Sequence, residues 1–233
     1  MNAILAIETS SGPCSVALEI DGEVECVHVE TPRAHARVLL PTISDLLANR
    51  QIGFDELSAI VYGQGPGSFT GLRIGCAVAQ GLAWAHDLPT LGVSSLEVLA
   101  ERVRSEVADA IVGIVTIVDA RMDELYLAAF EVVDAKLERV LDDQVCSPAN
   151  ARAALASAVP DAFKDWLLVG DGVDLAWPGG TDARRTDVHE PDARALLRCA
   201  RGRLSVEAGD ARAVQPVYLR DESRWRKQTP VAS

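Results

Sequence analysis

A glycine-rich stretch, GQGPGSFTGLRIG at residues 63–75, decides how the rest of the chain is interpreted. The apolar run at 57–62 predicts a buried strand before it, and the small apolar residues at 76–85 predict a buried helix after it. A strand that turns through glycines into a helix leaves backbone N–H groups free at the helix start, where Ser68 or Thr70 can cap them. Such a turn suits either a phosphate site or a plain sharp bend. A Walker-type loop is excluded because no Lys-Ser/Thr pair follows the glycines.

The helix after this turn carries a stripe of small residues at four-residue spacing, namely Gly71, Gly75, Ala79 and Ala83. Residues four apart lie on one helix face. Glycine inside a helix costs about 1 kcal/mol relative to alanine. The stripe therefore predicts the close approach of another backbone, which belongs either to the same chain or to a partner.

The composition narrows the possible functions. The chain has 233 residues, 48% of them hydrophobic, enough for one large domain or two lobes. No apolar run reaches the roughly 18 residues of a membrane span, and Glu8 interrupts the first one, so we expect a cytoplasmic protein. Five scattered cysteines without CxxC pairs indicate reduced thiols. A net charge of −12 argues against strong nucleic-acid binding by this chain alone.

The order of predicted elements occurs twice, about 110 residues apart in the sequence. The first copy has strands at 3–9, 14–20 and 23–29, a helix at 34–49 interrupted by Pro41, and a strand at 57–62 before the glycine stretch. The second copy has strands at 110–118, 125–133 and 137–145, a helix at 149–159, and a strand at 165–169 before Gly170-Asp171-Gly172. In each copy the first strand ends in an acid, Glu8 or Asp119.

This duplication predicts an N-terminal lobe at 1–107 and a C-terminal lobe at 108–233. A final helix is expected at 191–207, where it can pack back on the first lobe. The basic tail at 220–233 either touches RNA in a complex or is simply exposed.

Two acid-ended strand meanders facing glycine turns resemble the actin-like ATPase fold (ASKHA, ribonuclease H-like). This α/β fold has two similar lobes, each with a mixed sheet and helices. Within that fold the chain is similar to the TsaB (YeaZ) family from residue 3 to about 220. The motifs that carry the resemblance are IETSS at 7–11, GPGSFTGLRIG at 65–75, SSLE at 94–97, DARM at 119–122 and PVYLR at 216–220.

The resemblance implies a role in forming threonylcarbamoyladenosine next to the tRNA anticodon, beside the catalytic relative TsaD. TsaD binds its metal with two histidines four residues apart, and the matching positions here are Ser95 and Leu99. Leucine cannot ligate a metal and neutral serine is a poor ligand. The resemblance thus implies no catalytic and no metal-binding residue in this chain. The remaining candidates for cofactor binding are Glu8, Thr9, Ser10 and Asp119, and for the two acids turn capping is an equal alternative.

The short turn Gly170-Asp171-Gly172 replaces the longer purine loop expected of a nucleotide binder. We therefore expect no cofactor in the isolated chain, and ATP or ADP and metal in the partner subunits. TsaB proteins pair with TsaD, and with themselves, through the N-lobe helices, here 34–49 and 69–85. The predicted partner-binding residues are His35, Leu39, Leu40, Ile43, Leu47, Phe69, Thr70, Leu72, Arg73, Gly75, Cys76 and Ala79.

The implied assembly also includes a TsaE-type ATPase, uses threonylcarbamoyl-AMP from a TsaC-type enzyme, and reaches tRNA only as a complex. If the small-residue stripe faces a partner, Gly75→Leu should weaken partner binding more than folding. Two enzyme alternatives stay open at this point. Glu8 and Asp119 suit an active actin-fold ATPase or small-molecule phosphotransferase, while a peptidase is disfavoured by the absent zinc signature.

Overall fold

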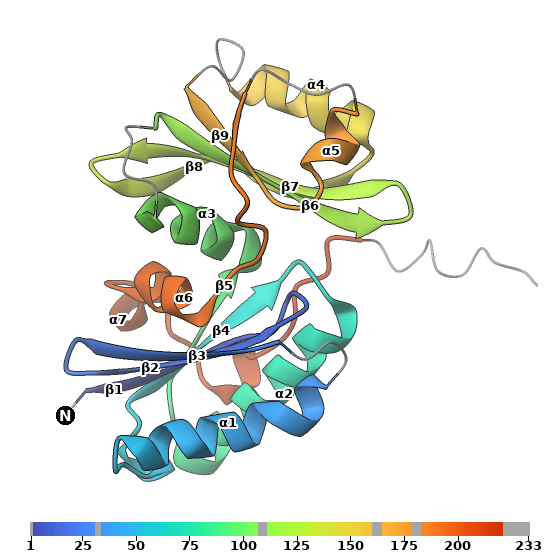
Figure 1. The fold of residues 1–233 in the computed structure, drawn as a ribbon. Coiled ribbons are helices and arrows are strands. Elements are labelled where there is room, and N and C mark those ends of the chain that lie inside the picture. Colours follow the sequence, from blue (N-terminus) through green and yellow to red (C-terminus); the bar gives the residue numbers. More distant parts are fainter. Residues whose placement is uncertain (1, 31–33, 107–110, 160–164, 179–182, 221–233) are drawn as a thin grey trace, which may run out of the picture.

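The computed structural model describes residues 2–30, 34–106, 111–159, 165–178 and 183–220, which form two α/β lobes one above the other (Figure 1). The layers alternate between helices and sheets. The order is α4 with α5, the second sheet, α3, α6 with α7, the first sheet, and α1 with α2.

The first sheet has the strand order β3-β2-β1-β4-β5. Its strands are β1 (Ala3–Glu8), β2 (Cys14–Ile20), β3 (Glu23–Val29), β4 (Ala59–Gly65) and β5 (Thr90–Ser94). The first three strands form an antiparallel meander, whereas β4 and β5 run parallel to β1. Asp21 and Gly22 form the first hairpin turn with positive φ, as an Asp-Gly pair predicts.

The second sheet repeats this arrangement as β8-β7-β6-β9-β10. Its strands are β6 (Gly113–Arg121), β7 (Glu124–Val133), β8 (Lys136–Cys146), β9 (Trp166–Val169) and β10 (Arg184–Arg185). The first three are again antiparallel, and β9 and β10 again run parallel to the first strand. The shared strand order confirms the predicted duplication and the two-lobed actin-like fold.

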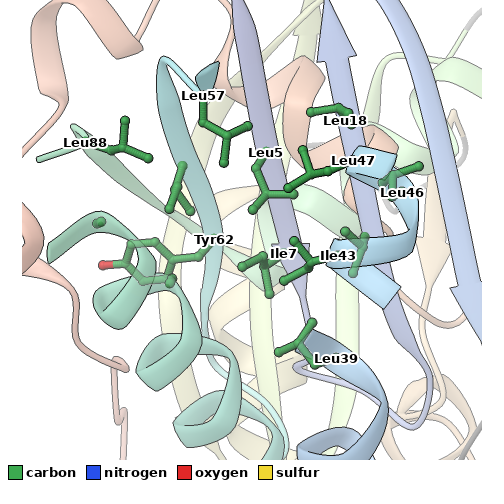
Figure 2. Close-up of a cluster of buried hydrophobic side chains, with 14 of the residues drawn as sticks. Leu5, Ile7, Leu18, Leu39, Ile43, Leu46, Leu47, Leu57, Tyr62 and Leu88 are labelled. Atoms are coloured by element: carbon green, nitrogen blue, oxygen red, sulfur yellow. The ribbon is translucent and has the colours of Figure 1, made fainter. Parts of the chain in front are cut away.

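Helices α1 (His35–Asn49) and α2 (Phe69–His86) cover the outer face of the first sheet. Their apolar sides meet the sheet in one buried cluster, shown in Figure 2. The cluster includes Leu5, Ile7, Leu18, Leu39, Ile43, Leu46, Leu47, Leu57, Tyr62 and Leu88. Pro41 lies inside α1 without dividing it.

Each of the two inner helices packs on the sheet formed by the other half of the sequence. Helix α3 (Ser95–Glu106) buries Leu99 and Val103 with Phe130 in the core of the second lobe. Helix α6 (Ala193–Ala200) buries Leu196 with Val61 in the core of the first lobe. A boundary between residues 107 and 108 therefore separates the two sheets but not the helices that pack on them.

The predicted single helix at 191–207 is wrong. The chain instead forms α6 and the short α7 (Leu204–Glu207), separated by a turn in which Gly202 has φ +76°. Asp192 caps α6 by accepting a hydrogen bond from the backbone N–H of Ala195.

The remaining elements are η1 (Phe54–Glu56), α4 (Pro148–Ala158), α5 (Val173–Ala176) and η2 (Ala211–Ala213). Within the described ranges, no helix has the length and apolar content needed to cross a membrane. Most of the predicted basic tail, 221–233, lies outside the described residues.

Candidate functional site

The two lobes enclose a cavity of about 1120 Å³. The first lobe contributes the turn after β1 and the start of α2. The second lobe contributes the turn after β6, and the segment at 187–191 crosses between them. The chemistry of the cavity lining bears on whether a nucleotide could bind there.

The two strand-end acids play the same structural role. A carboxylate oxygen of Glu8 accepts a hydrogen bond from the backbone N–H of Ser10 at 2.7 Å. A carboxylate oxygen of Asp119 accepts one from the backbone N–H of Arg121, also at 2.7 Å. Each acid thus caps the turn two residues beyond it, which is the turn-capping alternative left open above.

Glu8 lies beneath the turn rather than in the cavity. Its side chain is buried, and burial raises the pKa of its carboxyl group above 4.5. Its Oε2 atom has no hydrogen-bond partner within the described part of the chain. A Cβ atom at Gly63 would lie 2.1 Å from that oxygen, so only glycine fits beside it. This enclosed carboxyl group is not presented to a ligand in the cavity.

Of the four cofactor candidates, only Ser10 and Asp119 line the cavity. The Thr9 hydroxyl is buried and donates to the carbonyl oxygen of Gly71 at 2.9 Å. Asp119 also forms an ion pair with Arg121 at 2.7 Å. The prediction that Glu8 and Thr9 contact a cofactor is therefore corrected, because both side chains are committed to the interior of the first lobe.

The cavity lining is acidic, with Asp119, Asp171, Asp187 and Glu190 on its walls. Two arginines also line it, and both are paired. Arg121 binds Asp119, and Arg102 binds Asp192 at 3.4 Å and Glu106 at 3.3 Å. Among the described lining residues, no arginine or lysine is uncommitted for a phosphate group. A nucleotide triphosphate would meet net negative charge here.

Both glycine turns are packed directly against the strand ends they face. The Ser68 N–H donates to the carbonyl oxygen of Ser10 at 2.7 Å. In the second lobe the Gly172 N–H donates to the carbonyl oxygen of Ile117 at 3.0 Å, and a Cβ atom at Gly170 would lie 2.2 Å from that oxygen. At both turns, the backbone of the glycine turn packs directly against the backbone of the facing strand end.

The positions that match the TsaD metal ligands do line the cavity, but their side chains do not fit a metal. Leu99 has no donor atom, and its side chain is fully buried. The Ser95 hydroxyl is buried without a hydrogen-bond partner in the described structure. One neutral oxygen is a poor substitute for two imidazoles.

Most of the predicted partner-binding residues lie inside the first lobe. The buried ones are His35, Leu39, Ile43, Leu47, Leu72, Gly75, Cys76 and Ala79. His35 Nε2 lies 3.2 Å from the carbonyl oxygen of Pro13, within hydrogen-bonding distance. The partner-binding prediction is corrected for these residues, because each packs within the folded chain. Leu40, Phe69, Thr70 and Arg73 are exposed.

The predicted small-residue stripe of α2 faces the sheet of its own lobe. A Cβ atom at Gly71 would lie 2.1 Å from the carbonyl oxygen of Thr9, and one at Gly75 would lie 2.2 Å from the Thr9 hydroxyl. Ala79 and Ala83 are buried in the same direction. The backbone that approaches this stripe belongs to the same chain, which corrects the interpretation that it faces a partner.

A second stripe of small residues, missed by the sequence reasoning, is the exposed one. Ala77, Gly81 and Ala85 are exposed at four-residue spacing on α2, and a Cβ atom added at Gly81 would meet no packed neighbour within 4 Å. Trp84 lies beside them with 66% of its surface exposed. The sequence shows both stripes, because the exposed one has the same four-residue spacing as the buried one and is offset from it by two residues. Periodicity alone could not show which of the two faced solvent.

The exposed start of α2 carries a cluster that brings together distant parts of the chain. The guanidinium of Arg73 lies 3.7 Å above the Phe69 ring and its Nε donates to the Tyr218 hydroxyl at 2.8 Å. The rings of Phe69 and Tyr218 are 5.5 Å apart. Aromatic and arginine side chains of this kind are enriched at the centres of protein interfaces.

Comparison with known proteins identifies relatives that span nearly the whole chain. Residues 28–175 match the TsaD family model, described as tRNA N6-adenosine threonylcarbamoyltransferase. The protein "tRNA threonylcarbamoyladenosine biosynthesis protein TsaB" of Haemophilus influenzae is 35% identical over 96% of both chains. Its Escherichia coli namesake is 34% identical over 96% of this chain and 97% of its own. The solved structure of YeaZ from Pseudomonas aeruginosa has a TM-score of 0.80 at 33% identity, and covers 94% of this chain and 100% of its own.

Proposed function

Because this chain belongs to the TsaB (YeaZ) family, we propose that it takes part in forming threonylcarbamoyladenosine on tRNA as a non-catalytic partner of a TsaD-type transferase. The observation that carries the proposal is the pair Ser95 and Leu99, which line the cavity without a usable metal-ligand pair. The partner would supply the metal, the nucleotide and the transfer chemistry. We expect this role to be carried out in the cytoplasm, where the tRNA is.

The cavity chemistry supports the proposal that no nucleotide binds to the isolated chain. Its lining is acidic and its arginines are paired, and the enclosed Glu8 is not positioned to hold a magnesium ion in the cavity. The alternative is an actin-fold phosphotransferase, favoured by the cavity volume alone. Titration calorimetry with ATP and Mg²⁺, together with an assay for phosphate release, tests this point. Micromolar binding with turnover by the pure chain would overturn the non-catalytic role.

We propose that the partner binds the outward faces of α1 and α2. The exposed apolar residues there are Leu40, Phe69 and Trp84, with Arg73 between the last two along α2. Ala77 and Gly81 form a shallow strip between Arg73 and Trp84 that lets another helix approach closely. The same face would serve self-pairing of the free protein. A TsaE-type ATPase would join the larger complex, and the net charge of −12 favours contact with tRNA through the partners.

Gly81 allows a clean test of this surface. Its Cβ position is open, so Gly81→Trp should fold normally while placing a large side chain where a partner helix would approach. We expect co-expression with the TsaD relative of the same genome to give a stoichiometric complex for the wild type on size-exclusion chromatography with light scattering. Gly81→Trp should lose that complex, with a thermal stability no lower than that of the wild type.

The matched control is Gly81→Ala, which adds only a methyl group at the same position. It should keep the complex. If Gly81→Trp binds the partner as the wild type does, then the partner uses another surface. Failure of the wild type itself to form any complex would instead contradict the proposed function.

A further inference from the structure

Three side chains with metal-binding atoms meet beside the cavity, at Glu190, which is the one of the three that lines it. They are His28 in β3, Glu30 just beyond that strand, and Glu190 in the segment that crosses between the lobes. One ligand atom from each lies within 4.8 Å of the other two. We propose that these three residues bind a divalent transition-metal ion of the Zn²⁺ class.

The arrangement of donor atoms suits such an ion. Zinc binds imidazole nitrogen and carboxylate oxygen at about 2.0–2.2 Å, which puts neighbouring donors of a tetrahedral site about 3.4 Å apart. The His28 Nε2 atom and a Glu30 carboxylate oxygen are already 3.3 Å apart. The third donor, a carboxylate oxygen of Glu190, lies within 4.8 Å of both. The Glu30 side chain is 77% exposed, so it has room to adjust around an ion.

Electrostatics favours a cation at this point. The carboxylates of Glu30 and Glu190 approach each other, and His28 and Arg102 act against their repulsion. Asp171 on the facing lobe adds to the negative field at Glu190. A divalent ion would reduce this repulsion, and three protein ligands, one nitrogen and two oxygens, leave a tetrahedral zinc ion one open position for water.

The backbone around the third ligand is already fixed. The Arg102 guanidinium donates to the carbonyl oxygen of Glu190 at 2.8 Å and also pairs with Asp192. The Glu190 carboxylate lies against the turn after β1, where a Cβ atom at Gly12 would be 3.4 Å away. The bound ion would therefore tie the edge strand of the first sheet to the crossing segment that leads into α6.

The test uses the full chain with Zn²⁺ and with Co²⁺ as a spectroscopic probe. We expect one Zn²⁺ per chain by titration calorimetry and an increase in the thermal unfolding temperature. Co²⁺ should give visible d–d bands without the near-ultraviolet band of a cobalt–thiolate bond, which would report the cysteines instead. His28→Ala and Glu190→Gln should each weaken binding at least tenfold and abolish the thermal shift.

The control is His86→Ala, which removes a histidine that stacks on Phe54 away from the cluster. It should bind Zn²⁺ as the wild type does. Circular dichroism of the variants separates lost binding from lost folding, and the conservative Glu190→Gln keeps the side-chain shape. The proposal is overturned if the wild type binds no ion, if a thiolate band dominates, or if His28→Ala and Glu190→Gln bind as tightly as the wild type.

Discussion

At the scale of single residues, the acids at the ends of β1 and β6 show how one sequence feature supports two functions. An acid after a first strand suggests magnesium or phosphate chemistry. Here Glu8 and Asp119 each accept a backbone N–H two residues on, and so hold the turns in shape. Burial leaves Glu8 with an electrostatic cost, which is the cause of the raised pKa of its carboxyl group.

Glu8→Gln should reveal that cost as a pH dependence. Burial raises the folded-state pKa of Glu8 above 4.5. As the pH rises above 4.5, the unfolded chain releases the proton while the folded protein keeps it, so the free energy of unfolding falls until the raised pKa is passed. Glutamine keeps the acceptor for Ser10 and has no proton to release. The stability of the variant relative to wild type should therefore rise with pH in urea denaturation, whereas a pH-independent difference would contradict the assignment.

Two glycines of α2 should respond in opposite directions to the same substitution. Gly75→Ala places a Cβ atom 2.2 Å from the Thr9 hydroxyl, and relief of this clash should lower the free energy of unfolding by about 1–3 kcal/mol. Gly81→Ala meets no packed neighbour within 4 Å and should raise the same quantity by up to about 1 kcal/mol. Chemical denaturation of both variants checks the pair. Equal effects would mean that the buried and exposed stripes are wrongly assigned.

At the scale of elements, local sequence patterns predicted the secondary structure of each segment. They predicted less well which face of each element packs against the rest of the chain. Alternating residues located the strands, and Asp21-Gly22 located a hairpin. The final helix was predicted too long because its composition stays helical through the turn at Gly202. The orientation of α2 was inaccessible, since both its stripes are small and spaced alike. Burial decides between them, and burial depends on contacts with Thr9, more than sixty residues earlier.

The C-terminal segment is an element whose role only long-range contacts show. Val217 donates its backbone N–H to the carbonyl oxygen of Gln64 in the first lobe at 2.7 Å. Three residues later, Arg220 pairs with Glu124 of the second lobe at 2.7 Å and donates to the carbonyl oxygen of Ala120 at 3.0 Å. The sequence showed only a short apolar run before a basic tail. The segment in fact connects the two lobes.

Arg220→Ala should loosen this connection. The Arg220 side chain is only 15% exposed, and its bonds to a carboxylate and to carbonyl oxygens are lost together. We expect the free energy of unfolding to fall by about 1–3 kcal/mol in urea denaturation. Arg121→Ala is the matched control, because that side chain is 80% exposed and its ion pair should contribute under about 1 kcal/mol. Equal losses of unfolding free energy in the two variants would show that the contacts of Arg220 stabilise the protein no more than an exposed ion pair does.

At the scale of the whole molecule, the internal duplication explains why the two sheets are alike. The inner helices join the two lobes, because each packs on the sheet of the other half of the chain. The identical strand order in both lobes follows the repeated pattern of the sequence. Of the cavity residues, Ser10 and Asp119 could be located from that pattern, whereas Glu8 and Thr9 proved to be buried beneath the turn. The contacts of Arg102 in the cavity wall could not be predicted from the sequence, since Arg102 meets Asp192 and Glu190 only when the segment that crosses between the lobes is in place.

The two inner helices predict that neither half folds alone. A fragment of residues 1–107 would lack α6, whose Leu196 covers the first sheet, and would expose the apolar face of α3. A fragment of 108–233 would lose α3 from the core around Phe130. Buried side chains of this size contribute about 1.5–3 kcal/mol each, so the loss of a whole helix with several of them is comparable to the roughly 5–15 kcal/mol by which a domain is stable. We expect each fragment to be unfolded by circular dichroism and the two to assemble when co-expressed. A cooperative thermal transition in either fragment alone would show that the lobes are independent domains.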